Sequence, residues 1–219
     1  MSLAEKVRRA IGQKEHVVWD WNGTLLADVD HAIAVGNELM AGQGLRLMDR
    51  ERFRAEFEFP ILTYYQKLGF NFELESFESL CHRFVARFME GVRDLPLVPE
   101  MESVLFSLKA EGLHQSVLSA SDQESLDFMI DHFGLRDVFG LVYGIDDKFA
   151  ASKIARGHSL MAVSPAAKEK TVLIGDTLHD LEVARALGID AILISHGHQC
   201  VTRLRAHHDV VIEAALSDA

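Results

Sequence analysis

The stretch HVVWDWNGTLL, residues 16–26, decides the fold, because a continuous apolar run ends abruptly in an aspartate and a glycine turn. Continuous apolar runs are typical of strands that are buried on both faces, as in a parallel sheet. Five later segments share this character, and we predict a strand in each: SVLSAS (116–121), VFGLVYG (138–144), TVLIGD (171–176), AILIS (191–195) and DVVI (209–212).

Helical patterns separate these predicted strands. Residues 101–111 place apolar side chains at helical spacing, and Ser121 and Glu124 resemble a capping box before a second helix. A helix that starts near Asp180 stops at Gly188, since glycine is favoured just after a helix end. Strands that alternate with helices predict an α/β fold with a doubly wound, Rossmann-like parallel sheet.

One long region breaks the alternation. Residues 28–93 carry helical patterns throughout, and the segment RDLPLVPE (93–100) is typical of a linker because of its two prolines. We therefore predict a core domain formed by residues 1–25 and 97–219, and an inserted all-helical cap domain formed by residues 26–96.

The charge and composition restrict the partners. The chain has 219 residues and a formal net charge of −11, which disfavours nucleic acid and anionic lipid. The N-terminal residues lack the apolar stretch of a secretory signal, and no apolar run is long enough to span a bilayer. Two distant cysteines favour a reduced, cytoplasmic compartment. The sequence leaves a monomer and a homodimer equally open.

Acidic side chains follow two of the predicted strands. Asp20 follows the first, and Asp176 and Asp180 follow the fourth, four residues apart. Ligands of open parallel sheets bind beyond the carboxyl ends of the strands, and paired carboxylates suit a hard cation such as Mg²⁺. Each group taken alone could instead cap a turn or a helix, as acidic side chains often do.

Two further groups gain weight from their positions. Ser119 lies at the end of the second strand, where its hydroxyl could donate to a phosphate or cap a helix. Lys153 precedes a helix at 153–162 and could balance the carboxylates, although a surface position is the common alternative. Lys148 is a rival; we prefer Lys153 because an amphipathic helix follows it at once.

The order of these groups resembles the haloacid dehalogenase superfamily, most closely its phosphoglycolate phosphatase-like branch. The matching motifs are Asp20–Leu25 for the family pattern DxDGTL and Gly175–Asp180 for GDxxxD, with Ser119 and Lys153 between them. The resemblance covers almost the whole chain, and the helical insertion falls where that superfamily carries a small cap. It implies a Mg²⁺-dependent phosphatase that acts on a small phosphorylated metabolite.

The resemblance also implies a role for each matching residue. Asp20 would attack phosphorus and become an aspartyl phosphate, which water then hydrolyses. Mg²⁺ would be held by Asp20, the backbone carbonyl of Asn22 and Asp176, with support from Asp180. The transferring phosphoryl group would be bound by side chains and backbone amides of the matching loops: Asp20, Gly23, Thr24, Ser119, Ala120 and Lys153.

Asn22 departs from the family pattern. The family has an aspartate there that protonates the leaving group and later activates water, and an amide cannot exchange a proton near neutral pH. General acid–base catalysis is worth about 10²–10⁴ in rate, so alkyl phosphates should react slowly. The enzyme could use substrates with good leaving groups, such as acyl or aryl phosphates, or His179 could supply the proton. A long-lived phosphoenzyme, or binding alone, is the third possibility.

Other polar side chains are weaker candidates. Arg54 and Tyr64 in the predicted cap could contact the leaving group, although cap aromatics more often form a core. For His179, a solvent-facing position in the first helical turn is the simpler interpretation. The segment His196-Gly197-His198 could line the site, but two histidines without a third ligand make a poor zinc site, and a polar turn is the simpler interpretation.

Two other functions fit the same residues. A phosphotransferase or phosphomutase would pass the phosphoryl group to a sugar, which Asn22 disfavours because the acceptor needs a base. A non-catalytic phosphometabolite-binding protein would tolerate Asn22. A dehalogenase has no need of the acidic pair Asp176 and Asp180.

Overall fold

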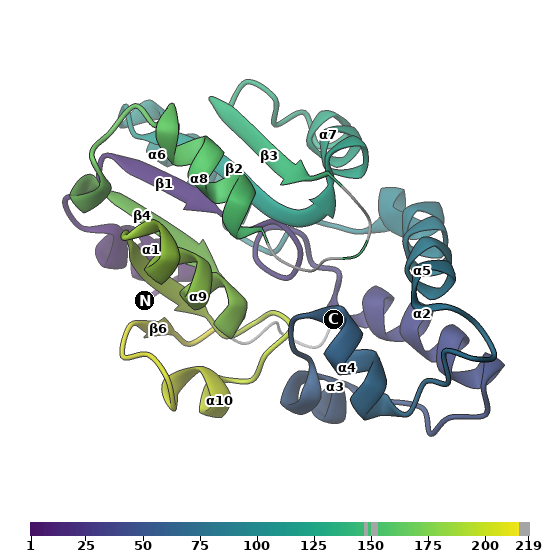
Figure 1. The fold of residues 1–219 in the computed structure, drawn as a ribbon. Coiled ribbons are helices and arrows are strands. Elements are labelled where there is room, and N and C mark those ends of the chain that lie inside the picture. The colour runs from purple at the N-terminus through teal and green to yellow at the C-terminus, as the bar shows by residue number, and fades with distance from the viewer. Residues whose placement is uncertain (147–148, 150–152, 215–219) are drawn as a thin grey trace.

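The computed structural model describes residues 1–146, 149 and 153–214. Its centre is a parallel six-stranded sheet in the order β3-β2-β1-β4-β5-β6 (Figure 1). This confirms the predicted α/β fold with its doubly wound sheet. The strands are β1 (His16–Trp19), β2 (His114–Asp122), β3 (Leu141–Ile145), β4 (Thr171–Gly175), β5 (Asp190–Ile194) and β6 (Val211–Ile212).

Helices cover both faces of the sheet because its strands are apolar on both sides. Val17 and Trp19 of β1 pack into one hydrophobic cluster, while Val18 packs into the other. The first cluster is closed by α1 (Leu3–Ile11), α6 (Met101–Ala110) and α7 (Gln123–His132), and the second by α8 (Ile154–Ala162) and α9 (Leu178–Leu187). The short elements η2 (Lys168–Lys170) and α10 (Val201–Arg205) precede β4 and β6.

Of the helices between β1 and β2 along the chain, four α-helices lie beyond the carboxyl ends of the strands, whereas α6 packs on the sheet (Figure 1). The chain leaves and returns side by side, since Ala27 N–H donates to the Pro96 carbonyl at 3.0 Å and Val98 N–H to the Leu25 carbonyl at 2.8 Å. We call these helices the cap; they are α2 (Val29–Gly42), α3 (Arg50–Glu56), α4 (Ile61–Leu68) and α5 (Phe77–Gly91), followed by η1 (Val92–Asp94). The exact division into two domains at 25/26 and 96/97 stays a prediction.

Some predicted boundaries were wrong. β3 begins at Leu141 rather than at residue 138, and β6 contains only two residues. Helix α7 is capped by Asp122, which accepts from Ser125 N–H at 3.1 Å, and not by Ser121. The helix after β4 does end at Gly188, whose φ of 71° is left-handed, as predicted.

Candidate active site

The carboxyl ends of the two central strands place the acidic residues beside each other. β1 lies between β2 and β4, and Asp20 and Asp176 directly follow β1 and β4. Oxygens of Asp20, Asp176 and Asp180 all lie within 4.8 Å of one another, and all three residues are buried. The structure therefore brings together three of the side chains that the sequence singled out.

Lys153 is the cation at the centre of this group. Its Nζ contacts Asp20 Oδ1, lies 2.6 Å from Asp180 Oδ1 and donates to the Leu118 carbonyl at 3.0 Å. Burial alone would lower the pKa of Lys153, but the charges of Asp180 and Asp20 raise it above its usual value. The side chain is therefore a permanent cation beside the expected nucleophile. Lys148, its rival, lies outside the described residues.

The carboxyl of Asp20 is the group that most needs a further cation. Burial raises its pKa to about 8 despite Lys153, and the charges of Asp180 and Asp176 act in the same direction. The Thr24 hydroxyl lies 3.1 Å from Asp20 Oδ2 and 3.2 Å from Asp176 Oδ1, so it bridges the two carboxylates. A positive ion between these oxygens would favour the ionised form of Asp20.

Asp180 is fixed by the first turn of α9. Its Oδ2 accepts from the backbone N–H of Thr177 at 3.0 Å and from the Thr177 hydroxyl at 2.7 Å. A Cβ at Gly175 would come within 2.2 Å of Asp180 Cγ, so glycine is required where β4 ends. This packing explains the GDxxxD pattern: the glycine makes room for the second carboxylate.

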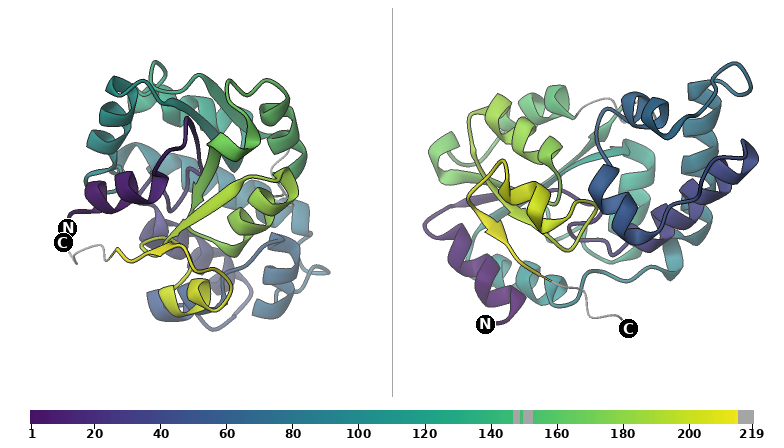
Figure 2. Two further views of the ribbon diagram at one scale, coloured as in Figure 1. Left: turned by 90° about the vertical axis from the view of Figure 1, so that its left-hand side faces the viewer. Right: turned by 90° about the horizontal axis from the view of Figure 1, so that it is seen from below.

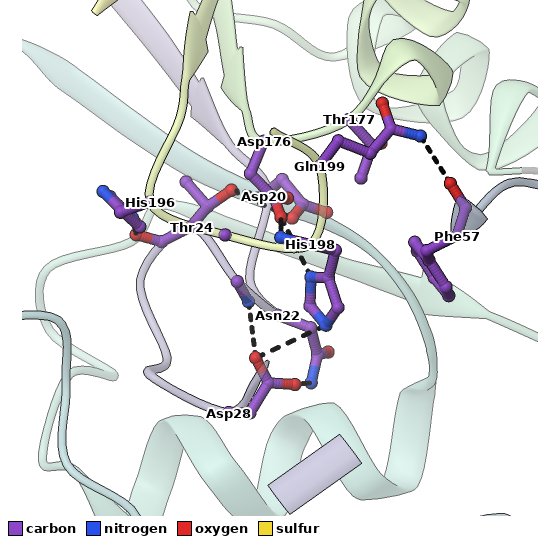
Figure 3. Close-up of polar contacts among 12 residues, drawn as sticks. Asp20, Asn22, Thr24, Asp28, Phe57, Asp176, Thr177, His196, His198 and Gln199 are labelled. Atoms are coloured by element: carbon purple, nitrogen blue, oxygen red, sulfur yellow. Dashed lines mark hydrogen bonds and ion pairs between the residues drawn. The ribbon is translucent and has the colours of Figure 1, made fainter. Parts of the chain in front are cut away.

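Asn22 lines the cavity between cap and core and is held in a polar network. Its Nδ2 donates to Asp28 Oδ2 at 2.7 Å (Figure 3). Its Oδ1 accepts from the Ser121 hydroxyl at 2.7 Å. Asp28 also accepts from Gly23 N–H at 2.7 Å and is almost completely buried. Burial raises the pKa of Asp28. The sequence does not single out Asp28, which lies outside both motifs, and it suggests Ser121 only as a helix cap.

His198 connects this network to the acidic cluster. Its Nδ1 lies 2.9 Å from Asp176 Oδ2, its backbone N–H donates to the same oxygen at 2.5 Å, and its Nε2 lies 3.7 Å from Asp28 Oδ1 (Figure 3). Burial alone would lower the pKa of His198, but the charges of Asp28 and Asp176 raise it to about 9. The turn at 196–198 is therefore a buried part of the site and not merely a polar connection.

Two of the remaining predicted phosphate-binding groups line the cavity between cap and core, and a third, Gly23, packs against His198. Ser119 and Ala120 line it beside Asp20, and the Ser119 hydroxyl accepts from Ser121 N–H at 3.0 Å. Gly23 has a φ of 74°, and a Cβ there would come within 2.2 Å of His198 Nδ1. Only glycine fits this close approach without displacing the histidine.

The three residues proposed for substrate contact lie in different settings. His179 is buried and stacks on Phe59 with ring centroids 4.5 Å apart, so a solvent-facing position was wrong. Burial lowers its pKa to about 4. Tyr64 lines the cavity, and its hydroxyl contacts Met48 Sδ at 3.2 Å.

Arg54 connects the cap to the core through hydrogen bonds. Its guanidinium donates to the carbonyls of Gly197 at 2.9 Å and Gln199 at 3.4 Å, and also contacts that of Ser195. Gln199 in turn donates to the Phe57 carbonyl at 2.8 Å (Figure 3). Figure 2 shows α10 beside the same cap segment, and Arg203 of α10 donates to the Ala55 carbonyl at 3.1 Å. Arg54 therefore fastens the cap to the loop that carries His198.

The acidic cluster fits Mg²⁺ in its chemistry. All three side chains offer oxygen, the ligand type that Mg²⁺ prefers. The three carboxylates and the buried Asp28, when ionised, carry two more charges than the cations Lys153 and His198. Asp122, which is also buried and lines the cavity, adds a further negative charge, so a divalent cation would reduce the excess. The residues present therefore fit the predicted metal.

The cavity between cap and core has a volume of about 180 Å³. Its core wall is polar and contains Asp20, Ser119 and Lys153. Its cap wall is apolar and rich in aromatic side chains, among them Met40, Met48, Phe57, Phe59, Tyr64 and Phe88. No helix in the described part of the chain is long and apolar enough to cross a membrane.

Comparison with known proteins agrees with this geometry. The family model described as haloacid dehalogenase-like hydrolase matches residues 17–194. The chain therefore belongs to the haloacid dehalogenase-like hydrolases, as the resemblance in the sequence predicted.

Curated relatives that align over most of this chain carry phosphatase names, whereas others that align over 97 residues are named tyrosine-protein kinase PtkA. It is 27% identical over 213 residues to "Probable phosphatase IndB" of Dickeya dadantii, covering 94% of this chain and 91% of that one. It is 25% identical over 212 residues to a phosphoglycolate phosphatase of Chromobacterium violaceum, covering 92% and 94%. A solved haloacid dehalogenase-like family hydrolase from Streptococcus pneumoniae shares the fold, with a TM-score of 0.74, 18% identity and coverage of 92% and 94%. These findings confirm the predicted class of enzyme, a phosphoric monoester hydrolase of the phosphoglycolate phosphatase-like branch.

Proposed function

We propose that this chain is a Mg²⁺-dependent phosphatase that hydrolyses a small phosphorylated metabolite through an aspartyl phosphate on Asp20. The observation that carries the proposal is that one buried lysine, Lys153, contacts Asp20 and Asp180. Carboxylate oxygens of these two residues and of Asp176 all lie within 4.8 Å of one another. Such a group combines a nucleophile, a cation for phosphoryl oxygens and a set of metal ligands.

Each side chain of the site has a distinct role in the proposed phosphoryl transfer. Asp20 Oδ2, which faces Thr24 rather than Lys153, attacks phosphorus while the bond to the leaving oxygen breaks. Lys153 and the Ser119 hydroxyl stabilise the charge on the transferring oxygens. Asp20, Asp176 and the Asn22 carbonyl would hold Mg²⁺, with Asp180 in support, and the bound ion would neutralise phosphoryl charge. Water then cleaves the acyl phosphate, which releases inorganic phosphate and restores Asp20.

The test is Mg²⁺-dependent phosphate release from acetyl phosphate, a small substrate with a good leaving group. We expect turnover by the parent with Mg²⁺, loss of at least about 10³-fold in Asp20→Asn, and no loss in the control Asp30→Asn, whose side chain is exposed. With ³²P-labelled substrate, acid quenching should trap label on the parent and none on Asp20→Asn.

Two outcomes would overturn the proposal. Equal turnover in the parent and in Asp20→Asn would show that Asp20 is not the nucleophile. No turnover of any phosphoester or acyl phosphate, together with retained binding of inorganic phosphate, would favour the non-catalytic binding protein.

A further inference from the structure

The cap wall of the cavity contains no charged side chain. Every described cavity residue between Ala32 and Met89 is apolar, aromatic, or small and neutral, and the polar atoms among them are the Tyr64 and Tyr65 hydroxyls and the Cys81 thiol. Lys153 is the only lysine or arginine that lines the described cavity, and Asp20 and Asp180 already contact it. The leaving group of a bound substrate would therefore meet an uncharged, mainly apolar wall.

Aromatic rings cover the reactive end of the cavity. Phe57 lies 5.1 Å from His198 between ring centroids, and Phe59 stacks on His179 at 4.5 Å. Tyr64 meets Phe57 edge-on at 5.3 Å. Aromatic walls favour flat rings in offset or edge-on contact, so the cap offers a suitable surface for an arene.

The size of the cavity agrees with an arene. A dry apolar cavity of about 150 Å³ is enough to hold benzene, a general observation on engineered proteins. The cavity here has about 180 Å³ including its acidic end, so a single ring is the upper limit for the leaving group that it admits.

Asn22 gives a second, independent argument. Its amide is held between Asp28 and Ser121 at 2.7 Å each, and it has no proton to give to a leaving oxygen. A phenolate leaves without protonation far more readily than an alkoxide, since its conjugate acid has a pKa near 10, as the tyrosine side chain does. The apolar wall and the missing acid thus select the same type of ester.

We propose that the substrate is an aryl phosphate monoester, with its neutral ring against the cap aromatics and its phosphate at Asp20. This inference rests on the proposed phosphatase function and specifies its substrate class. It also predicts poor use of phosphoglycolate, because the carboxylate of that molecule would lie against an uncharged wall without a partner.

Four esters test separately the uncharged cap wall and the absence of a proton donor at Asn22. Phenyl and 4-carboxyphenyl phosphate differ by a carboxylate on the ring, and phenyl and benzyl phosphate differ in whether a phenol or an alcohol leaves. We expect kcat/KM for phenyl phosphate to exceed that for 4-carboxyphenyl phosphate by on the order of 100-fold, although the carboxyl group makes the leaving group better. Benzyl phosphate and phosphoglycolate should each be slower than phenyl phosphate by about 10²-fold or more.

A pair of variants on one helix tests the cavity wall. Val85 of α5 lines the cavity, whereas its neighbour Ala86 is exposed and does not. Val85→Lys should reduce the preference for phenyl over 4-carboxyphenyl phosphate by at least about tenfold, because the new cation pairs with the carboxylate. Ala86→Lys, which adds the same charge outside the cavity, should leave the preference unchanged.

Acetyl phosphate separates failure of this inference from failure of the proposed function. If Mg²⁺- and Asp20-dependent hydrolysis of acetyl phosphate is retained but phenyl phosphate is no better than phosphoglycolate or 4-carboxyphenyl phosphate, the substrate class is wrong and the phosphatase stands. If the two lysine variants change the preference equally, the cap wall does not contact the ring. If acetyl phosphate is not hydrolysed either, the proposed function fails, and this inference fails with it.

Discussion

Replacing Asn22 by the aspartate of the family pattern should not by itself restore acid–base catalysis, because Asp28 lies behind it. In Asn22→Asp the new carboxylate would face Asp28 Oδ2 across the 2.7 Å that now separates the amide from that oxygen. Two charges about 4 Å apart repel each other by about 4 kcal/mol at an effective dielectric of 20. That energy corresponds to about three pKa units, so the two carboxyls would share one proton near neutral pH.

The single variant should therefore be less stable and only weakly improved. We expect a loss of about 1–3 kcal/mol in the free energy of unfolding, since a buried hydrogen bond is replaced by repulsion. For a chain of this size that lowers Tm by roughly 3–10 °C. Hydrolysis of benzyl phosphate should rise by less than the full contribution of a general acid, because the proton is held between positions 22 and 28.

The exchange variant Asn22→Asp with Asp28→Asn should behave differently. It keeps one amide and one carboxylate in contact and leaves the net charge unchanged, so Tm should return close to that of the parent. The rate of benzyl phosphate hydrolysis should then rise toward the 10²–10⁴-fold that general acid–base catalysis contributes. The rate with phenyl phosphate should rise by only about tenfold or less, because a phenolate leaves without a proton. Asp28→Asn alone is the control and should give no such gain.

Thermal unfolding and phosphate release with both esters measure these effects. A single variant as stable as the parent would show that the two side chains do not oppose each other. An exchange variant that is fully folded yet no faster on benzyl phosphate would refute the assignment of the missing acid to position 22.

Three further predictions concern stability and the floor of the site. Lys153→Met should lower the free energy of unfolding by about 3–5 kcal/mol and Tm by about 10 °C, because two buried carboxylates lose their cation. Added Mg²⁺ should restore part of this stability. An unchanged Tm would contradict the buried ion pairs. Burial lowers the pKa of His16 to about 4, so the stability that the neutral histidine gives above pH 6.5 is lost as the pH falls. Between pH 7 and 5 the free energy of unfolding of the parent, measured in urea, should fall by about 2 kcal/mol more than that of His16→Gln. Equal losses in the two proteins would show that His16 does not cause this pH dependence. Gly23→Ala should abolish phosphatase activity and weaken Mg²⁺ binding, because the added Cβ would meet His198 and Asp176. The control Gly44→Ala has a similar φ but open space around it, so it should lower the free energy of unfolding by only about 1 kcal/mol and leave activity unchanged. Loss of activity in both variants would point to unfolding instead.

The residues that sequence reasoning found are those with local signals. Asp20 and Asp176 directly follow apolar strands, and the order of strands along a parallel sheet brings such ends to one edge. The position of Lys153 before a helix predicts it as a site residue, and its Nζ does contact Asp20. These inferences needed only the period of the pattern and the rule for ligand sites in open sheets.

The roles that the sequence did not predict depend on long-range closure. Asp28 was not singled out at all, and His198 was given only as a residue that could line the site, with a polar turn as the simpler interpretation. The two are separated by 170 positions, and each has an ordinary local role, at the start of a helix and in a turn. Their approach to 3.7 Å follows from packing of the loop after β5 against the loop after β1. His179 was misplaced for a related reason, since Phe59 of the cap covers it. No periodicity in the sequence reports such contacts.

The central position of β1 has a consequence for biosynthesis. Its neighbours β2 and β4 begin about 100 and 150 residues further along the chain, so the ribosome releases β1 long before either partner exists. Until then the run from His16 to Trp19 leaves its backbone N–H and C=O groups unpaired and three large apolar side chains uncovered, a condition that favours aggregation and that chaperones counter. The cap helices emerge next and can form from local contacts, so a nascent chain should carry a partly ordered lid before it has a sheet for that lid to cover.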